Sequence, residues 1–490
     1  MMTEVSAPRT QHAGVIGRLP RRSIVGYGFG DFANNLAFSL GASFLLYYYT
    51  DVAGISAAAV AAMFLVVRLW DAFTDLFAGR LVDRTMTRWG KFRPFILFGA
   101  VPLLFMSFLC FHVPSNVTYG TKLLYVYLTY AVLGLVYSLV NIPYGSLASA
   151  MTQDVQERAK LVSARTIGTA VAGVGLTWVI APKISALKDQ KKSLTSAQYL
   201  HQAQSIFTQT TLWFILIGTV AYLIVFLTTR EQVVRRTNRV SIRESFATLR
   251  HNRPLAYLCG ASFCYLTGMF ATLGVSAFYA QYILGDVKNA VWISLVSVGI
   301  SFVATPFVPA LVRRFGKKNL FVALGGFTVV GGVAIFLTPS NHLGLSLFFL
   351  GISGIGQSLI NTVMFGLEAD TVEYGEWKSG QRSEGATYAL FSFTRKVTQS
   401  IGGFLGAGLL ALGNYVSSSS SNSTPVQPDS ALTMIKFTMG IVPAVAATVA
   451  MIIFWKYPLT DKVFTQIRDE NELRKSATVN VSGEAEATPA

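Results

Sequence analysis

The sequence predicts an all-α integral membrane protein whose twelve transmembrane helices form two similar halves of six. Of its 490 residues, 52% are hydrophobic and only 13% are charged, and the mean hydropathy of +0.48 far exceeds that of an ordinary soluble domain. About twelve apolar segments are long enough to cross a bilayer core of roughly 30 Å, which takes roughly 20 helical residues. Basic residues gather in alternate connections between these segments. Together these observations exclude a soluble domain.

The predicted membrane spans follow one another at short intervals along the chain. They lie at 24–50, 57–79, 94–113, 122–149, 161–182, 208–228, 255–284, 289–311, 319–338, 343–367, 384–413 and 431–456. Several exceed the length of a straight crossing, so we expect tilt or extension beyond the bilayer. The first span lacks a signal-peptide cleavage pattern, so we expect it to serve as its own insertion signal.

The distribution of lysine and arginine predicts the orientation of the chain. The N-terminal segment and the second, sixth, eighth and C-terminal connections are rich in both residues, and the alternate connections hold few. The positive-inside rule therefore predicts a multi-pass protein of the cell membrane with both termini in the cytoplasm. The net charge of +16 then belongs to loops that face anionic lipid, and it requires no nucleic acid partner.

Two related halves are predicted from repeated motifs. The basic loop that contains Gly90 has a counterpart at Gly316, 226 residues later, and the segment that begins at Tyr144 has one at Phe365, 221 residues later. Nearly equal offsets are expected of a duplicated six-helix unit, although chance similarity of two basic loops is the alternative. The predicted organisation is a tail at 1–23, a half at 24–228, a linker at 229–254, a half at 255–456 and a tail at 457–490. This is the layout of the major-facilitator fold, in which a central cavity separates the halves.

The second span carries ionisable residues in the segment "RLWDAFTD". Arg68, Asp71 and Asp75 share one helical face, where charge is costly in the membrane and is a functional candidate by default. A static salt bridge is the alternative, but one arginine cannot neutralise two carboxylates. The excess negative charge suits a bound cation or an exchangeable proton.

Other polar residues stand inside the first, fourth, fifth and eleventh spans. Asp31 and Asn35 share a face, although Asp31 could equally make only local hydrogen bonds. Arg165, Arg395 and Lys396 lie deep in apolar sequence and suggest an anionic ligand; the alternative is pairing with acids near the end of the tenth span. Further candidates for the substrate site are Arg68, Tyr137, Asn141, Gly145 and Gln399.

Two mixed-charge segments lie at predicted cytoplasmic ends of helices. Salt bridges between such segments can hold the two halves closed on the inner side. The candidate gating residues are Arg88, Lys91, Arg93, Glu373, Glu376 and Arg382.

Several motifs in matching order resemble the glycoside–pentoside–hexuronide:cation symporter family, a melibiose-carrier-like group of the major facilitator superfamily. They are "YGFGDFANN", "LLYYYTDVAG", "WDAFTD", "RWGKFRPFILFG", "NIPYGSLASAMTQ", "EADTVEYGEW" and "FSFTRK", and the resemblance runs from about residue 24 to 461. Within this family, the segments "NIPYGSLA", "EADTVEYGE", "LFSFTRK" and "YPLTDK" are most similar to those of glucuronide carriers.

The resemblance implies a role for each matching position. Asp71 and Asp75 are expected to form the cation site, with Thr74 and Ser138 as further oxygen ligands. The positions of Asn35, Asn141, Gly145, Arg165 and Lys396 are expected to face the sugar. Melibiose-type members have aspartates where this chain has Asn35 and Asn141, and asparagine keeps hydroxyl recognition without repelling a uronate.

The expected function is symport of a glucuronide with a cation, H⁺ rather than Na⁺, by alternating access. A pentoside or neutral glycoside carrier using Na⁺ or H⁺ is the alternative within the family. Outside it, a membrane enzyme acting on a lipid-linked sugar and a sugar sensor are less consistent with the motifs. We expect no catalytic residue, no cofactor beyond the coupling ion, no bound metal site and no required oligomeric state. Cys110, Cys259 and Cys264 lack metal-ligand spacing and are expected to form no disulfide.

Overall fold

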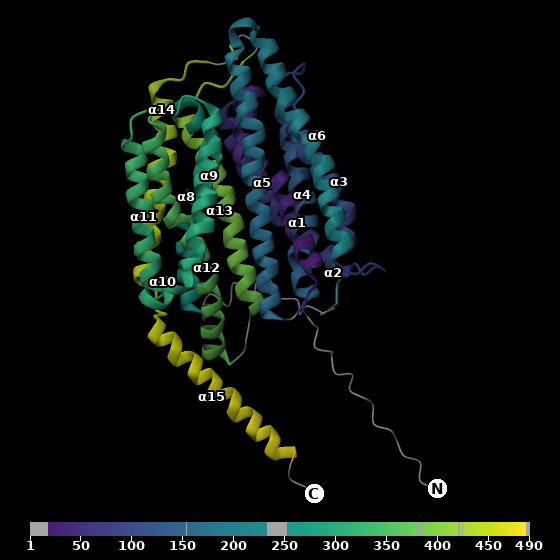
Figure 1. The fold of residues 1–490 in the computed structure, drawn as a ribbon, viewed down its shortest axis with the longest axis vertical. Coiled ribbons are helices and arrows are strands. Elements are labelled where there is room, and N and C mark those ends of the chain that lie inside the picture. The colour runs from purple at the N-terminus through teal and green to yellow at the C-terminus, as the bar shows by residue number, and fades with distance from the viewer. Residues whose placement is uncertain are drawn as a thin grey trace.

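A bundle of long helices makes up the computed structural model, which describes residues 18–152, 154–232, 252–380, 384–419, 422–423 and 425–486 (Figure 1). The first half contains α1 (Arg21–Tyr47) with its π turn η1 (Tyr48–Val52), α2 (Ala57–Arg84), α3 (Arg93–Cys110), α4 (Tyr119–Met151), α5 (Val155–Asp189) and α6 (Ser196–Thr228). The second contains α8 (Arg253–Phe278) with η3 (Tyr279–Ile283), α9 (Ala290–Ala304), η5 (Thr305–Phe307), α10 (Val308–Phe315), α11 (Lys317–Leu337), α12 (Leu343–Ser379), α13 (Glu384–Leu412) and α14 (Asp429–Trp455). Short turns η2 (Lys191–Ser193) and η4 (Val287–Asn289) connect helices, and α15 (Asp461–Glu486) follows the second half.

Local sequence explains where several helices begin and end. The side chains of Ser56, Thr118 and Asp154 accept hydrogen bonds from backbone N–H groups in the first turns of α2, α4 and α5. At the C-terminal end of α12, Gly380 has φ of +71° and ends the helix in a left-handed conformation that glycine adopts at little cost. Each predicted span corresponds to one helix, with its π turn in the case of α1 and α8, or to the continuous run α9–η5–α10.

The two halves pack their helices in the same way, which supports the predicted duplication. In the first half, α1 contacts α5 and α6, α3 contacts α4 and α6, and α2 contacts α4. In the second half, α8 contacts α13 and α14, α11 contacts α12 and α14, and α9 contacts α12. Figure 1 shows the halves side by side. This repeated arrangement of two six-helix halves is the major-facilitator fold with twelve transmembrane helices.

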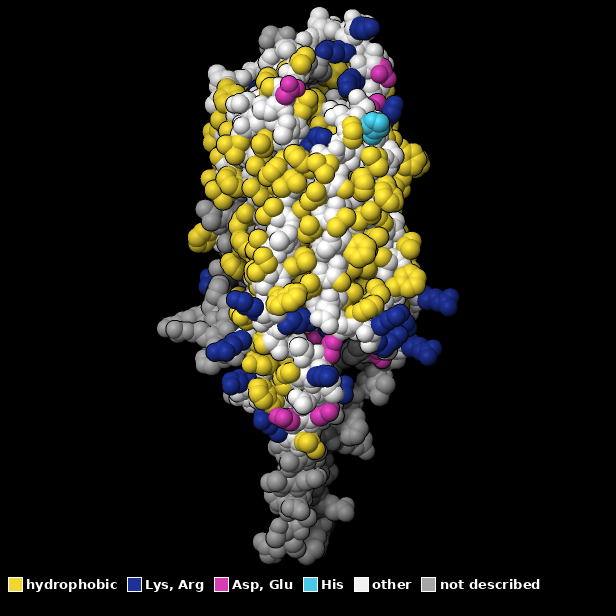
Figure 2. Space-filling model, turned by 90° about the vertical axis from the view of Figure 1, so that its left-hand side faces the viewer, with side chains coloured by type: hydrophobic (Ala, Val, Ile, Leu, Met, Phe, Trp, Pro, Cys, Tyr) yellow, Lys and Arg dark blue, Asp and Glu magenta, His cyan; other side chains and the backbone are white. Residues whose placement is uncertain are grey.

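Charged residues distinguish three helices from the other membrane-crossing helices. Within the described residues, nine helical segments are long and apolar enough by composition to cross a membrane, and α1, α2 and α13 are not among them. These three carry Asp31 (α1), Asp71 and Asp75 (α2), and Lys396 (α13). Figure 2 shows a broad hydrophobic band, with a wide zone of lysine and arginine below it and a smaller group above it. Two of these helices, α2 and α13, supply the charged residues that line the central cavity, and α5 adds a further interior charge, Arg165.

The two ends of the bundle differ. We call the end where α1 begins and α2 finishes the basic end, and the other the opposite end. At the opposite end, hydrogen bonds connect the halves: the Ser418 N–H donates to Thr50 O at 3.0 Å, and the Ser185 hydroxyl donates to Asp286 Oδ2 at 2.7 Å. The halves are therefore held together there.

Helices extend beyond several predicted spans. The tenth was expected to end at 367, but α12 continues to Ser379 and packs against α15, where the Trp377 indole donates to Glu470 Oε2 at 2.6 Å. A run of apolar residues marks only the part of a helix that lies in lipid. The length of a helix that continues beyond the lipid is therefore underestimated from the sequence. Most of the predicted linker at 229–254 lies outside the described residues, and the boundaries of the two halves stay a prediction.

Candidate functional site

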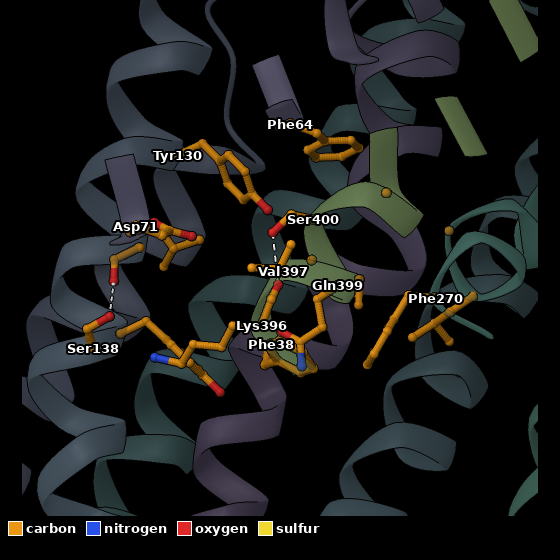
Figure 3. A pocket seen from close by; sticks show the side chains of 18 of the residues that line it. Phe38, Phe64, Asp71, Tyr130, Ser138, Phe270, Lys396, Val397, Gln399 and Ser400 are labelled. Carbon is orange, nitrogen blue, oxygen red and sulfur yellow. Dashed lines mark hydrogen bonds between the residues drawn. The ribbon is translucent and has the colours of Figure 1, made fainter. Parts of the chain in front are cut away.

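A cavity lies in the middle of the bundle, between the halves (Figure 3). It contains roughly 1370 Å³ of empty space, part of it open to solvent, and its walls come from α1, α2, α4, α8 and α13. Six of the residues singled out from the sequence line it: Asp71, Asp75, Tyr137, Ser138, Lys396 and Gln399. The cavity thus contains three of the four predicted cation ligands, all but Thr74. It also contains two predicted substrate contacts from the second half, Lys396 and Gln399.

An ion pair across the cavity joins the two halves. Lys396 on α13 contacts Asp75 Oδ2 through its ammonium, and the Ser138 hydroxyl on α4 donates to Asp75 Oδ1 at 2.6 Å. The Lys396 side chain nevertheless stays 43% exposed, against 22% for Asp75. The ammonium is therefore accessible to another anion in the cavity.

Asp71 lies one helical turn from Asp75 and close to the backbone of α4. A Cβ atom on Gly134 would stand 2.1 Å from Asp71 Oδ1, so a larger residue at this position would displace the carboxylate. Thr74 is buried, and its hydroxyl donates to the backbone oxygen of Asp71 at 3.0 Å. Gly134 was missed in the sequence, although it stands four residues before Ser138 on the same face of α4.

Aromatic side chains that the sequence did not distinguish from packing residues line the same cavity. Phe38 stacks on Tyr137 with ring centroids 5.7 Å apart, and Phe64 meets Tyr130 edge to face at 5.6 Å. Figure 3 shows Phe270 beyond Gln399. A cavity with aromatic walls and a few convergent polar groups is the usual architecture of a small-molecule site.

A second polar cluster lies beside the cavity, within the first half. Arg165 on α5 binds Asp31 on α1 in a fork, with Nε to Oδ2 at 2.6 Å and Nη2 to Oδ1 at 3.3 Å. Its guanidinium also lies 5.0 Å from the ring centre of Tyr144. An anionic ligand was expected for Arg165, with acids near the end of the tenth span as the alternative partners. In the structure its partner is instead Asp31 on α1, which is 134 residues away in sequence, and its contact with a substrate stays a prediction.

The two asparagines predicted to face the sugar belong to this cluster. Asn35 donates to Asp31 O at 2.8 Å and to Thr169 Oγ1 at 3.0 Å. Asn141 accepts from Asn34 Nδ2 at 2.7 Å. Asn34 was missed in the sequence because its neighbour Asn35 matched the family position. Neither predicted asparagine is among the residues lining the cavity.

Of the remaining predicted substrate positions, none whose side chain the structure describes is among the residues that line the cavity. A Cβ atom on Gly145 would meet nothing within 4 Å, so this part of α4 faces open space. The side chain of Arg68 lies outside the described part of the structure. Arg395 donates to Asn361 Oδ1 at 2.9 Å and lies 4.8 Å from the Phe365 ring centre, so it faces α12. Asp370, one of the acids considered as its partner, instead binds Lys317 at 2.6 Å.

The candidate gating residues occupy the basic end. The loop between α2 and α3 contacts the end of α6 and the residues that follow it. The backbone N–H groups of Lys91 and Arg93 donate to Glu231, and the Arg93 guanidinium donates to Phe226 O at 2.5 Å. The Arg88 guanidinium lies 4.5 Å from the Trp89 ring centre. In the second half, the backbone oxygens of Glu373 and Glu376 accept from Asn471 and Gly380, and Arg382 lies outside the described residues. Their gating role stays a prediction.

Together, these features define a class of protein. A two-halved membrane bundle that encloses a central polar and aromatic cavity, with an ion pair between the halves, is a transporter. The family model for MFS/sugar transport proteins matches residues 26–461. The chain therefore belongs to the MFS/sugar transport protein family, and the resemblance to glycoside–pentoside–hexuronide symporters is confirmed.

Two bacterial proteins illustrate the similarity over most of the chain. The chain is 45% identical to the glucuronide carrier protein homolog of Escherichia coli (strain K12) over 94% of its length and 97% of the relative's. It is 33% identical to the isoprimeverose transporter of Lactiplantibacillus pentosus over 84% of its length and 85% of the relative's. The protein is thus a sugar symporter of the major facilitator superfamily and not an enzyme.

Solved structures with low sequence identity share the fold. A bacterial homolog of the human lysosomal transporter Spinster, in an inward-facing and unoccupied conformation, aligns with a TM-score of 0.63 at 13% identity, over 92% of this chain and 99% of that one. The fucose:proton symporter of E. coli aligns with a TM-score of 0.53 at 12% identity, over 90% of this chain and 98% of that one. These alignments support the major-facilitator fold alone.

Proposed function

We propose that this protein imports a glucuronide together with a proton, by alternating access of the central cavity. In this proposal the basic end lies in the cytoplasm, as the excess of lysine and arginine indicates. The conformation described here is closed at the opposite end, where hydrogen bonds join the halves. The opposite end is therefore the outer gate.

The ion pair between Lys396 and Asp75 is the observation that carries the proposal. An ammonium that is half exposed in the cavity binds a carboxylate of the other half. When Asp75 takes up a proton, it loses its charge and releases Lys396. The freed ammonium can then bind the carboxylate of a uronate, and charge-assisted hydrogen bonds of this kind are among the strongest. Proton and anionic sugar thus favour each other's binding through a single lysine.

The neutral residues at two predicted sugar positions beside the cavity support the same substrate class. Where melibiose-type members of the family carry aspartates, this chain has Asn35 and Asn141. An aspartate near the cavity would repel a uronate, whereas asparagine donates and accepts hydrogen bonds without charge. The name of the 45% identical relative, a glucuronide carrier homolog, points in the same direction.

Proton coupling agrees better than sodium coupling with the contacts of the cation site. Sodium requires several oxygen atoms at once, but one oxygen of Asp75 already binds Lys396 and the other accepts from Ser138. The Thr74 hydroxyl is engaged with the backbone of its own helix. A proton needs only one oxygen of Asp71 or Asp75.

Uptake by proteoliposomes tests the substrate. We expect the protein to take up a labelled glucuronide and to discriminate against the matching glucoside, which lacks the carboxylate. Lys396→Gln should raise the KM for the glucuronide by roughly 10- to 100-fold, the worth of one charge-assisted hydrogen bond, and leave the low glucoside uptake unchanged.

The control for this experiment is Lys436→Gln, which removes an ammonium from α14, a helix that does not line the cavity. It should behave as the wild type. Equal uptake of glucuronide and glucoside by the wild type would instead favour a pentoside or neutral glycoside, and the proposal of an anionic substrate would be withdrawn.

A further inference from the structure

A buried carboxylate lies at the outer gate, away from the central cavity. Asp51, in the π turn η1 beyond the expected first span, is only 7% exposed. It accepts hydrogen bonds from the hydroxyl groups of Thr50, Tyr282 and Tyr415, each at 2.7 Å. The Tyr415 hydroxyl reaches both carboxylate oxygens.

These bonds connect the two halves of the protein. Asp51 belongs to the first half, whereas Tyr282 lies in η3 and Tyr415 follows α13 in the second half. The Ser418 N–H donates to the backbone oxygen of Thr50 next to this site. Opening the outer gate must separate Asp51 from both tyrosines and expose its carboxylate to water.

No cation compensates the charge of Asp51 in the part of the chain that the structure describes. The titratable groups that face it are the hydroxyls of Tyr47 on α1, Tyr199 on α6, Tyr282 and Tyr415, all neutral below pH 8 because tyrosine has an ordinary pKa near 10. The ammonium of Lys122 lies at the same end of the bundle, but it donates to the backbone oxygen of Ala53 at 3.2 Å and not to the Asp51 carboxylate. The site therefore holds one acid and neutral donors.

We propose that Asp51 is a proton-binding group of the outer gate, and that uptake of a proton at Asp51 stabilises the closed gate whereas its loss favours opening. This site is separate from Asp71 and Asp75, which lie in the middle of α2. It would make closure of the gate sensitive to the pH outside, in addition to any proton carried with the sugar.

The direction of the effect follows from burial. Burial raises the pKa of Asp51 from 3.8 to about 6, even though the three hydroxyl groups lower it. In the open gate the carboxylate would be hydrated and its pKa would return toward the ordinary value. The closed state thus binds the proton more tightly, so the closed fraction rises as the pH falls through about 6 and levels off near 4. A difference of about two pKa units corresponds to a change of roughly 100-fold in the ratio of closed to open gate.

Distances between spin labels on the two halves test this proposal without sugar or an ion gradient. Ser115 precedes α4 and Ser340 precedes α12, and both are exposed at the outer end. Labels at Ser115→Cys and Ser340→Cys, in a variant without the three native cysteines, should report a growing short-distance population from about pH 8 to pH 4. Asp51→Asn should give the short distance throughout, without a pH step.

Two further variants keep the experiment decisive. Tyr415→Phe removes a donor that favours the charged carboxylate, so its step should move to higher pH. Asp286→Asn is the matched control: it also bridges the halves, but hydrogen bonds from the Lys288 N–H and Ser185 and the charge of Lys288 outweigh burial and lower its pKa. It should keep the wild-type step. A wild type without a step, or the same step in Asp51→Asn, would overturn the proposal. Neither outcome depends on which sugar is carried.

Discussion

Asp71→Asn will abolish accumulation of the sugar against its concentration gradient. Asp71 sits against Gly134, one helical turn from Asp75 in the Asp75–Lys396 pair. We expect Asp71 to pass the coupling proton to Asp75, and a neutral amide cannot do so. Substrate binding through Lys396 remains, so the variant should still exchange labelled for unlabelled sugar across the membrane. Internal sugar will then rise only to the external concentration, whatever proton gradient is imposed on the proteoliposomes.

The control for this prediction is Asp469→Asn, which removes an exposed carboxylate from α15. Its concentrative uptake should match that of the wild type. If Asp71→Asn still accumulates the sugar several-fold above the external concentration, Asp71 has no role in coupling. The coupling proton would then be assigned to Asp75 alone.

Arg165→Gln will destabilise the folded protein by about 3–5 kcal/mol, because it leaves the charge of Asp31 buried without its partner. Unfolding in detergent, followed by circular dichroism, measures this loss. Asp31→Asn should cost a similar amount for the reciprocal reason. The double variant Asp31→Asn with Arg165→Gln removes both charges and should recover at least half of the lost stability.

An additive double variant would contradict this view of the pair. It would mean that Asp31 and Arg165 act independently, and Arg165 would again be a candidate contact for the substrate carboxylate. The result therefore also decides whether the cluster between α1, α4 and α5 supports the site or belongs to it.

The twelve spans and the importance of the charges in α1, α2 and α13 could be predicted from the sequence. Apolar length identifies a membrane helix, and a charge inside such a helix is costly enough to stand out. The partners of these charges could not be predicted. Lys396 and Asp75 are 321 residues apart, and Arg165 and Asp31 are 134 apart. Such pairs depend on how the helices pack, which local sequence does not encode.

Features that look like ordinary packing in the sequence were also missed. Gly134 is one of 42 glycines, and nothing in its neighbourhood indicates that a carboxylate lies against it. Phe38 stacks on the predicted residue Tyr137 at the wall of the cavity, but Phe38 itself is one of 35 phenylalanines in the chain. Their roles become visible only when α1 and α4 are placed together.

Proton movement that accompanies sugar uptake distinguishes symport with a proton from symport with sodium. Proteoliposomes loaded with a pH-sensitive dye, without any imposed gradient, would receive a glucuronide outside and be followed for internal acidification. We expect the interior to acidify on addition of the glucuronide, the matching glucoside to have little effect, and Asp71→Asn to abolish the signal. Glucuronide uptake that proceeds without acidification, and that instead requires external sodium, would contradict this expectation.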